Sequence, residues 1–267
     1  MVAWTDVYTR VAAPPVVPHP FGLFSVATPT SPPDPHWQAG VEWLPVGCGA
    51  GSTDISWTRD PCIKSLGSLV DPGPKSDHLI TADECVVSSA KPFTVYVYVT
   101  ASGTSSDVAG AEARARFEAG EEWAVENFVW NAMADQQPPF AAAASPVEAL
   151  AATEHRLATM YHGTGVIHMS RYTATLLSEQ LLRVGGQIQT LIGTPVAVGG
   201  GYETGVNEGA AHSIFGSGAI TVMRAPLDVY TAWERSVNDI LTLVERTYVV
   251  MRDCESYLPH YTYDLVP

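Results

Sequence analysis

The chain has 267 residues, of which 46% are hydrophobic and 16% charged, and its formal net charge is −14. With 14 Lys and Arg against 28 Asp and Glu, the chain has no basic stripe that would bind a phosphate backbone or an anionic membrane. The sequence also has no apolar run long enough to span a membrane and no signal pattern, so we expect a soluble protein made in the cytosol. The length predicts one large domain or two small ones, and the low charged fraction predicts that self-association covers much of the surface.

The first segment, residues 1–36, reads as an extended arm. It holds eight prolines, among them Pro14 and Pro15, and proline fixes φ and removes a donor, so neither a helix nor a central strand is expected. The segment is nevertheless apolar, with Phe21 and Phe24 as its largest side chains. An arm that lies against a neighbouring subunit accounts for both properties.

Residues 37–90 alternate short apolar patches with turn signals, which predicts a long hairpin. Its first limb carries Trp43 in "VEWLPVGCGAGSTDISW". The four cysteines of the chain form no C-x-x-C pair, so a zinc site is disfavoured. We expect reduced packing cysteines, and a bridge between Cys48 and Cys62 stays open as an alternative; the other two are Cys85 and Cys254.

A strand and a long helix follow. "PFTVYVYVT", residues 92–100, is filled with aromatic and β-branched residues. Residues 105–135 then show helical spacing over about 25 residues, or roughly 37 Å, which predicts a spine helix against which a neighbour packs. Its apolar face is Ala113, Phe117, Gly120, Ala124 and Phe128, with Trp130 as a further core or interface residue, and Glu118, Glu121, Glu122 and Glu126 lie on its other sides.

The second half mixes helices and strands without a regular βαβ repeat, so the fold class is α+β. We expect helices at 146–162 and at 171–185, the latter ending at Gly185. Strands are expected at 165–170, 195–198, 219–225 and 247–253, with a glycine-rich loop to about residue 218. The segment 231–247 fits a helix weakly and a strand equally.

The glycine run Gly199, Gly200 and Gly201, with Gly205 beyond it, follows an apolar strand as in some dinucleotide-binding loops. Such loops need a helix N-terminus directly behind the glycines, so that backbone amides point at the pyrophosphate. "VNEGAAHSIFGSG" follows here and has no helical periodicity. We therefore expect glycines that serve the shape of the chain, and no cofactor.

No catalytic or metal site is expected either. His155, His162 and His168 are close in sequence, but no H-x-x-x-H or H-E-x-x-H motif is present, so solvated or hydrogen-bonded histidines are favoured. There is no G-x-S-x-G nucleophile elbow, and Ser217 between two glycines reads as a turn.

The order of these elements resembles the tailed-phage major capsid protein with its Hong Kong 97-type fold, which encapsulins share. Two short motifs carry the resemblance further: "LIGTPV", residues 191–196, is similar to the family's segment before the capsomer-centre loop, and Glu245-Arg246 is similar to a motif in its last strands. The cysteine-bearing region 43–85 departs from the family pattern, and no N-terminal coiled-coil scaffolding segment is found.

The resemblance implies four parts: an N-arm at 1–36, an E-loop-like hairpin at 37–91, a P-domain at 92–140 and 219–267, and an A-domain at 141–218. It implies a non-enzymatic shell subunit that forms the hexamers and pentamers of an icosahedral head, is assembled in the host cytoplasm, and encloses DNA without sequence-specific binding. A scaffolding or decoration protein is a further candidate partner, and Lys64 and Lys75 are candidates for cross-links.

The subunit interface is expected at eleven positions: Pro14, Pro15, Phe21, Phe24, Trp43, Phe117, Phe128, Trp130, Gly199, Gly200 and Gly201. On this interpretation the glycines line the crowded centre of a capsomer. The alternatives are an encapsulin-like compartment shell or another virion protein of this fold, and, from a different class, a small-molecule enzyme that uses the 199–205 loop.

Overall fold

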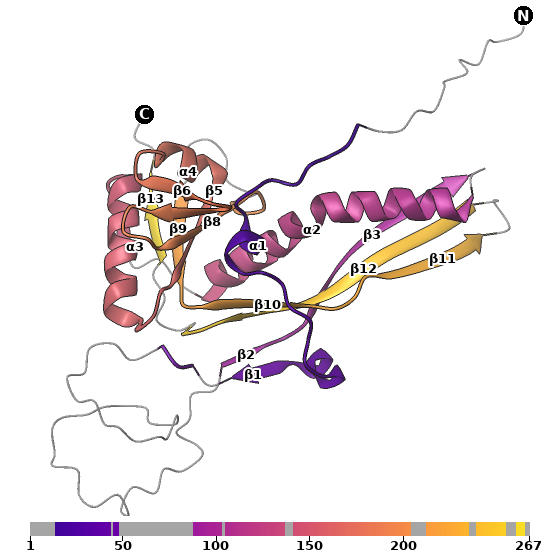
Figure 1. Cartoon of the computed structure of the whole chain (residues 1–267), viewed down its shortest axis with the longest axis horizontal. Coiled ribbons are helices and arrows are strands. Elements are labelled where there is room, and N and C mark those ends of the chain that lie inside the picture. Colours follow the sequence, from indigo (N-terminus) through magenta and orange to yellow (C-terminus); the bar gives the residue numbers. More distant parts are fainter. Residues whose placement is uncertain are drawn as a thin grey trace, which may run out of the picture.

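Two large β-sheets and one long helix dominate the part of the chain that the structure describes. The structure is a computed structural model that describes residues 14–43, 45–47, 88–102, 105–136, 141–203, 212–234, 239–254 and 260–264. Figure 1 shows an elongated molecule, with a compact group of short strands and helices at one end. A long, narrow sheet and helix α2 (Ser106–Gln136) extend from it toward the other end. None of the described helices is long and apolar enough to cross a membrane.

The long sheet is built around its central strand, β12 (Asp239–Arg252). This strand pairs antiparallel with β3 (Phe93–Ser102) on one edge, and with β11 (Asp228–Glu234) and β10 (Ile220–Arg224) on the other. The strands predicted at 92–100, 219–225 and 247–253 are therefore confirmed, as β3, β10 and the end of β12.

The segment that fits either a helix or a strand in the sequence is strand throughout its described part. It forms the end of β11 and the first half of β12. The helix-like spacing arises because β12 is apolar on both faces. Ile240 and Val244 are buried against α2, whereas Leu241 is 42% exposed on the opposite face.

The second sheet has seven strands in the order β4-β13-β9-β5-β8-β7-β6. They are β4 (Ala141–Ala143), β5 (Val166–Ser170), β6 (Leu181–Val184), β7 (Gln187–Thr190), β8 (Pro195–Gly199), β9 (His212–Ser217) and β13 (His260–Tyr263). Helix α3 (Pro146–Met160) contacts β9 and β13. The predictions of this helix and of β5 and β8 are confirmed, whereas β9 lies where the sequence suggests only a loop.

The helix predicted for 171–185 is mostly wrong. Helix α4 (Arg171–Leu176) stops after two turns, and the chain then forms the hairpin of β6 and β7. Gly185, expected to end the helix, lies in the hairpin turn with φ +60°. Glycine adopts this left-handed conformation without strain, which is why it suits a turn as well as a helix end.

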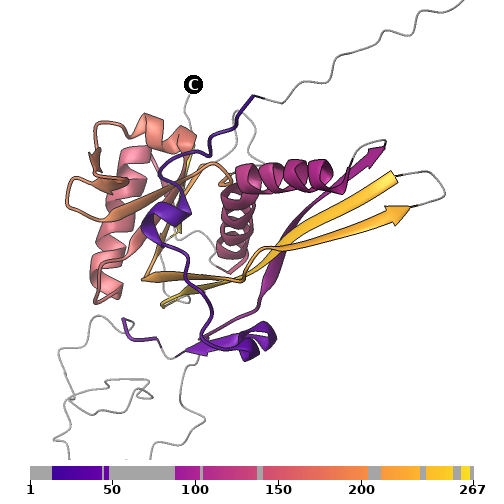
Figure 2. The ribbon, with the colours of Figure 1, turned by 45° about the vertical axis from the view of Figure 1, so that its right-hand side comes forward.

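Helix α2 confirms the predicted long helix but not the face assigned to it. Phe117 is buried as expected, but Ala124 is half-buried and Phe128 is 44% exposed. The buried positions mostly recur every four residues, and four residues turn a helix about 40° beyond one full turn. The buried stripe therefore winds around α2, which Figure 2 shows bent part-way along its length. The stripe comprises Ala109, Ala113, Phe117, Val125, Val129 and Met133.

Because the buried stripe winds around α2, this one helix packs against both sheets. Ala113 and Phe117, in the first half of α2, pack with Val99 and Val244 of the long sheet. The second half packs in a larger core that draws on both sheets; that core includes Val125, Val129, Met133, Ala197, Phe215, Val222 and Tyr248. The apolar surface buried in this shared core stabilises the packing of the two sheets against each other.

The arm is only partly extended, and part of it belongs to its own subunit. Helix α1 (Leu23–Val26) and the 3-10 helix η1 (Pro35–Ala39) interrupt it. Leu23 and Ala27 are buried in the core that contains Val125. The expectation that a neighbour covers the whole arm is therefore wrong for this part. Among the described residues of the arm, the segments 14–20 and 33–36 are exposed throughout.

The base of the predicted hairpin is present. β1 (Val41–Trp43) pairs antiparallel with β2 (Ser88–Ala90). After β1, the backbone amides of Val46 and Gly47 donate to the carboxylate of Asp253 at 3.2 and 2.9 Å, which ties this limb to the end of β12. The rest of the hairpin lies outside the described residues, and so do Lys64 and Lys75.

Two further expectations need correction. Cys254 is buried and disulfide-bonded rather than reduced; the other three cysteines, Cys48, Cys62 and Cys85, lie outside the described residues. Strand β13 pairs with β4 and β9, so it lies in the seven-stranded sheet and not with the rest of the 219–267 segment in the long sheet. The four-part domain division otherwise stays a prediction.

Candidate subunit-contact surfaces

The exposed segment 14–20 of the arm is the first candidate contact surface. Pro14 and Pro15 are exposed, and the side chains of Val16 and Val17 are 70% and 83% exposed. Exposed apolar groups on an extended, proline-stiffened segment lose little conformational freedom on binding. This segment, residues 14–20, therefore suits contact with another molecule.

The two phenylalanines of the arm lie against their own subunit. Phe24 is half-buried against the core shared by the two sheets. Phe21 is half-buried against the core of the seven-stranded sheet, with the guanidinium of Arg183 4.9 Å from its ring centre. Trp43, the next predicted contact residue, is half-buried in β1 opposite Ser88.

Two of the predicted contact residues on α2 belong to the interior instead. Phe117 is 1% and Trp130 is 7% exposed. The ring of Trp130 packs against Tyr202 and Phe215, with ring centres 5.0 and 4.6 Å away. These two predictions are wrong as interface assignments, because both side chains are covered within one chain.

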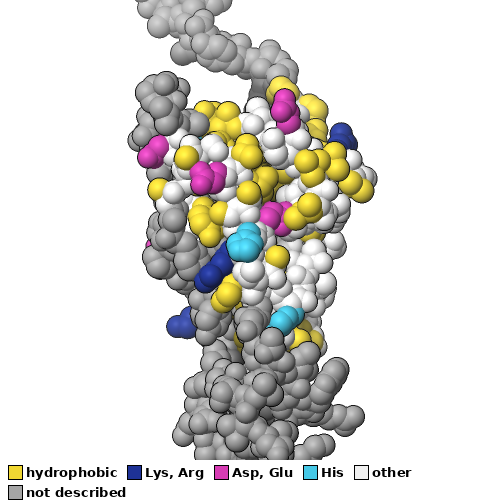
Figure 3. All heavy atoms as spheres, turned by 90° about the vertical axis from the view of Figure 1, so that its left-hand side faces the viewer, with side chains coloured by type: hydrophobic (Ala, Val, Ile, Leu, Met, Phe, Trp, Pro, Cys, Tyr) yellow, Lys and Arg dark blue, Asp and Glu magenta, His cyan; other side chains and the backbone are white. Residues whose placement is uncertain are grey.

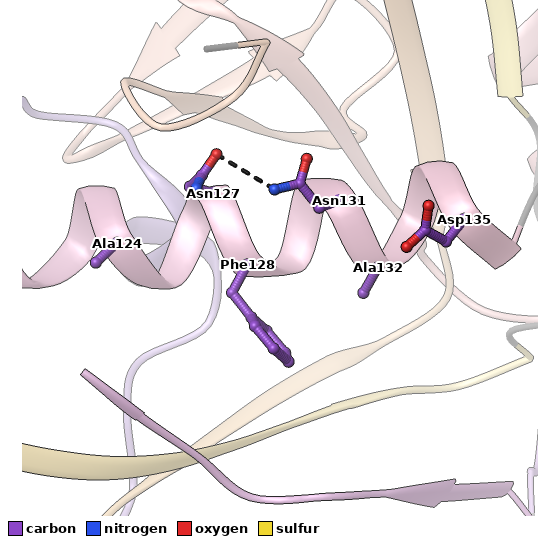
Figure 4. Close-up of a pocket in the computed structure, with 6 residues that line it drawn as sticks. All are labelled: Ala124, Asn127, Phe128, Asn131, Ala132 and Asp135. Atoms are coloured by element: carbon purple, nitrogen blue, oxygen red, sulfur yellow. Dashed lines mark hydrogen bonds between the residues drawn. The ribbon is translucent and has the colours of Figure 1, made fainter. Parts of the chain in front are cut away.

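Phe128 does lie on an accessible face of α2. Its ring stacks on Phe93 of β3, with ring centres 3.7 Å apart and planes at 16°. Around it is an open pocket of about 450 Å³ on the side of the helix. Figure 4 shows Phe128 on this face between the small side chains of Ala124 and Ala132. Small residues on both sides leave room for a partner to contact the aromatic ring.

The glycine loop packs on α2 of its own subunit. A Cβ atom at Gly201 would collide with the backbone carbonyl oxygen of Trp123 and lie 2.9 Å from the amide nitrogen of Asn127. The amide of Gly201 donates to Oε2 of Glu126 at 2.9 Å. A carboxylate thus takes the donor that a bound phosphate would use, and the glycine permits a close approach between loop and helix.

The position of this loop changes one expectation. Gly199 and Gly201 are buried, and Gly200 is half-buried beside His19 of the arm. These glycines relieve close contacts with Tyr202, His19 and α2 of the same subunit, so the crowding of a capsomer centre is not needed to explain them. The following residues, 204–211, lie outside the described part of the chain.

The outer face of the long sheet is a further candidate contact surface, one that the sequence did not predict. Tyr98, Leu243 and Tyr230 sit opposite one another on β3, β12 and β11, so their side chains share one face. Tyr98 and Tyr230 are 65% and 54% exposed, and Tyr96 and Leu241 extend the patch. The alternation of residues in β3 is the sequence signal that could have revealed this face.

The far end of the seven-stranded sheet carries another apolar patch. Leu182 and Val184 of β6 are 47% and 52% exposed, and Leu191 and Ile192 in the turn before β8 are 61% and 77% exposed. The last two belong to the "LIGTPV" motif, whose Gly193 takes φ +98° in that turn. Figure 3, which views the molecule from this end, shows apolar side chains scattered among few charged ones.

Three glutamates expected on the outward sides of α2 face the protein. Glu121 accepts hydrogen bonds from Arg246 at 2.5 Å and from the hydroxyl of Tyr248. Burial raises the pKa of Tyr248, and the hydrogen bond to Glu121 and its negative charge raise it further. The phenol therefore stays protonated and donates its proton to Glu121 in the hydrogen bond. Arg246 of the predicted Glu-Arg motif thus ties β12 to the middle of α2.

The other two glutamates, Glu122 and Glu126, bind backbone amides of the arm and of the glycine loop. Burial raises the pKa of Glu122 to about 7. The hydrogen bond from the amide of Phe24 opposes this shift, whereas the nearby charges of Glu126 and Glu121 add to it. Burial likewise raises the pKa of Glu126, which the amides of Gly201 and Leu23 oppose. Of the four glutamates, only Glu118 is exposed.

The histidines do not gather into a site. His155 and His162 are exposed, whereas His168 is fully buried and lies 3.0 Å from the Tyr202 hydroxyl and 2.8 Å from that of Ser217. Burial, with a smaller effect of the Arg252 charge, lowers the pKa of His168 to about 3, so its ring is neutral. Among the described residues, no three His, Cys, Asp or Glu side chains are placed to hold a metal ion.

No protein-family model matches the sequence, and none of the curated proteins is similar to it at a significant level. Solved structures are similar in fold. The capsid of an empty GTA particle matches with a TM-score of 0.60 at 12% identity, over 97% of this chain and 95% of that one. A structure from Microbacterium phage Oxtober96 matches with a TM-score of 0.54 at 10% identity, over 97% and 96%.

A third similar structure comes from a different kind of particle. The SrpI encapsulin of Synechococcus elongatus PCC 7942 matches with a TM-score of 0.51 at 11% identity, over 68% of this chain and 78% of that one. Elements from the arm to the last strand thus have counterparts in capsid structures. The α+β chain therefore has the Hong Kong 97-like capsid fold that its sequence resembles.

Proposed function

We propose that this chain is the major capsid protein of a tailed bacteriophage, a structural subunit that assembles into the hexamers and pentamers of an icosahedral head. The observation that carries the proposal is the fold match to the GTA capsid over nearly the full length of both chains.

The distribution of exposed apolar side chains supports a role in a shell. They lie on the arm at 14–20, on the outer face of the long sheet, around Phe128 and on the patch at Leu191 and Ile192. A shell subunit contacts several neighbours through different surfaces. Phe128, Trp43, Pro14 and Pro15 remain among the proposed contact residues.

The charge of the chain bears on the proposed contents of the head. A net charge of −14 disfavours tight binding to phosphates. The proposed head therefore encloses DNA as a container and does not read its sequence. We place the assembled protein in the virion after assembly in the host cytoplasm, with a scaffolding or decoration protein as a further partner.

An encapsulin-like compartment is the second candidate function, and the match to the SrpI encapsulin favours it. Both candidates are non-enzymatic shells, and they differ in what they enclose. An enzyme that uses the glycine loop is disfavoured, because the amide of Gly201 is bonded to Glu126.

Expression of the chain followed by size-exclusion chromatography and negative-stain imaging tests the proposal. Closed particles or rings are expected, and a small soluble oligomer would contradict a shell. Particles isolated from the natural host then distinguish the two candidates. Nuclease-protected DNA inside them supports a phage head, whereas protein cargo without DNA supports an encapsulin-like compartment.

A further inference from the structure

Two carboxylates on one side of α2 hold the arm by its backbone. Oε1 of Glu126 accepts the amide of Leu23 at 2.9 Å, and Oε1 of Glu122 accepts the amide of Phe24 at 2.7 Å. These amides open helix α1, which has no side-chain cap of its own. The other oxygen of Glu126 accepts the amide of Gly201. One helix turn thus joins the spine, the arm and the glycine loop.

The two carboxylates occupy the same small space. They are four residues apart on α2, so they lie on one helix face. A Cβ atom at Gly22 would collide with an Oε1 atom from each of them, so both oxygens lie against this one glycine. Glu126 is 2% exposed. Two negative charges this close together and this poorly hydrated repel each other strongly.

The surroundings supply few compensating charges. Among the described residues, the hydrogen bonds to the pair come from backbone amides. Charged or titratable groups face this junction from each packed element: Glu121 on α2, Arg171 on α4, Tyr202 after β8, Arg252 at the end of β12 and His19 in the arm. Glu121 is engaged by Arg246, and Arg171 donates to the carbonyl oxygen of Pro20 at 3.2 Å.

We propose that Glu122 and Glu126 share one proton while the arm is docked, and that loss of this proton loosens the arm from the spine helix. A protonated carboxylic acid still accepts an amide hydrogen bond through its carbonyl oxygen. The shared proton therefore preserves the contacts with Leu23 and Phe24 and removes the repulsion between the two side chains.

The direction of the pH effect follows from the titration of Glu122. Its pKa is about 7 when the arm is docked, against an ordinary value of 4.5 once solvent reaches the side chain. Between about pH 4.5 and pH 7, docking of the arm is therefore coupled to the uptake of a proton by Glu122. The resulting stabilisation is fully present below about pH 4.5 and is lost as the pH rises through about 7. Release of the arm is expected on the alkaline side.

Hydrogen–deuterium exchange on the full-length, unassembled subunit tests this proton-dependent docking of the arm. The readout is the opening equilibrium of the amides in residues 21–26, corrected for the intrinsic pH dependence of exchange. By linkage, a pKa of about 7 against 4.5 makes opening about 70-fold more favourable at pH 8 than at pH 5 if release exposes Glu122 fully.

Two variants distinguish the titration of Glu122 from a general effect of pH on the subunit. Glu122→Gln keeps an acceptor but removes the titration of residue 122, so its opening is expected to change much less than about 70-fold between the two pH values. The remaining response belongs to Glu126, whose pKa burial also raises. Glu118→Gln is the matched control, because Glu118 is exposed one turn earlier on α2, and it should retain the wild-type response.

A spectroscopic measurement keeps the proposal testable if Glu122→Gln does not fold. Infrared titration of the wild-type subunit should show the carbonyl stretch of a protonated carboxylic acid that persists at pH 6 and disappears by pH 8. The proposal is overturned if wild-type opening is the same at pH 5 and pH 8, if Glu122→Gln keeps the wild-type pH response, or if no protonated carboxyl is seen at pH 6.

Discussion

The close contact between the glycine loop and α2 makes Gly201 the position where the smallest added group has a large effect. In Gly201→Ala, the new methyl group would collide with the carbonyl oxygen of Trp123 and lie 2.9 Å from both the amide nitrogen of Asn127 and Cβ of Glu126. These atoms belong to a long helix packed on two sheets. The loop, rather than α2, must therefore move.

The magnitude has two parts. Overpacking of this kind costs about 1–3 kcal/mol. Movement of the loop also lengthens the hydrogen bond from Gly201 to Glu126, and an unsatisfied buried acceptor costs about 1–3 kcal/mol. Together these parts should lower the free energy of unfolding by about 2–6 kcal/mol. For a chain of this size, 1 kcal/mol corresponds to about 2–4 °C, so Tm should fall by about 4–24 °C.

Denaturant unfolding and calorimetry of the unassembled subunit measure this change. Gly186→Ala is the matched control, since a Cβ atom there meets nothing within 4 Å, and it should alter the free energy of unfolding by less than about 1 kcal/mol. If Gly201→Ala is as stable as Gly186→Ala, the glycine is not needed for the contact with α2, and the structural explanation of the loop is refuted.

Three further predictions concern α2, the arm and the buried histidine. Phe117→Ala should lower the free energy of unfolding by about 3–5 kcal/mol, whereas Phe128→Ala, with a 44% exposed side chain, should cost less than half as much and reduce assembly instead; equal losses in denaturant unfolding would contradict the assigned faces. Removal of residues 1–17 should leave circular dichroism and Tm unchanged and weaken assembly measured by sedimentation, and shells of normal heat stability would show that this segment makes no contact. Because the pKa of His168 is lowered to about 3, only the unfolded state takes up its proton as the pH falls below about 6.5, so stability should decline by up to about 1.4 kcal/mol per pH unit. His168→Gln should flatten this decline, His155→Gln should not, and an unchanged slope in His168→Gln would exclude a neutral buried ring as its cause.

Long and locally consistent segments could be predicted from the sequence. The aromatic and β-branched run of β3 and the sustained periodicity of α2 each agree with their tertiary surroundings, so the local pattern was enough. Gly185 could not be assigned in this way, because the same residue ends a helix or turns a hairpin. Strand β12 was ambiguous since both of its faces are apolar, and only packing against α2 distinguishes the two faces.

The contact residues were harder to predict than the fold. Phe117 and Phe128 look equivalent in a straight helix, and only the winding of the buried stripe separates a core residue from an accessible one. Glu122 and Glu126 look like solvated charges by composition. Their burial depends on the arm and the glycine loop, which are about 100 and 75 residues away in sequence; periodicity within one element cannot show such distant contacts.

The winding stripe on α2 also has a mechanical consequence. Because one continuous helix is fastened to both sheets, a rotation of one end of the subunit against the other must twist or bend that helix rather than open a hinge between domains. The strain would spread over many backbone hydrogen bonds and behave as an elastic restoring torque. Gly120 lies midway along α2, with open space where a Cβ atom would be added. It makes the helix more compliant there, since glycine is a weaker helix former than alanine by about 1 kcal/mol. The stiffness of α2 can thus be changed at a position where an added methyl group would meet no neighbour.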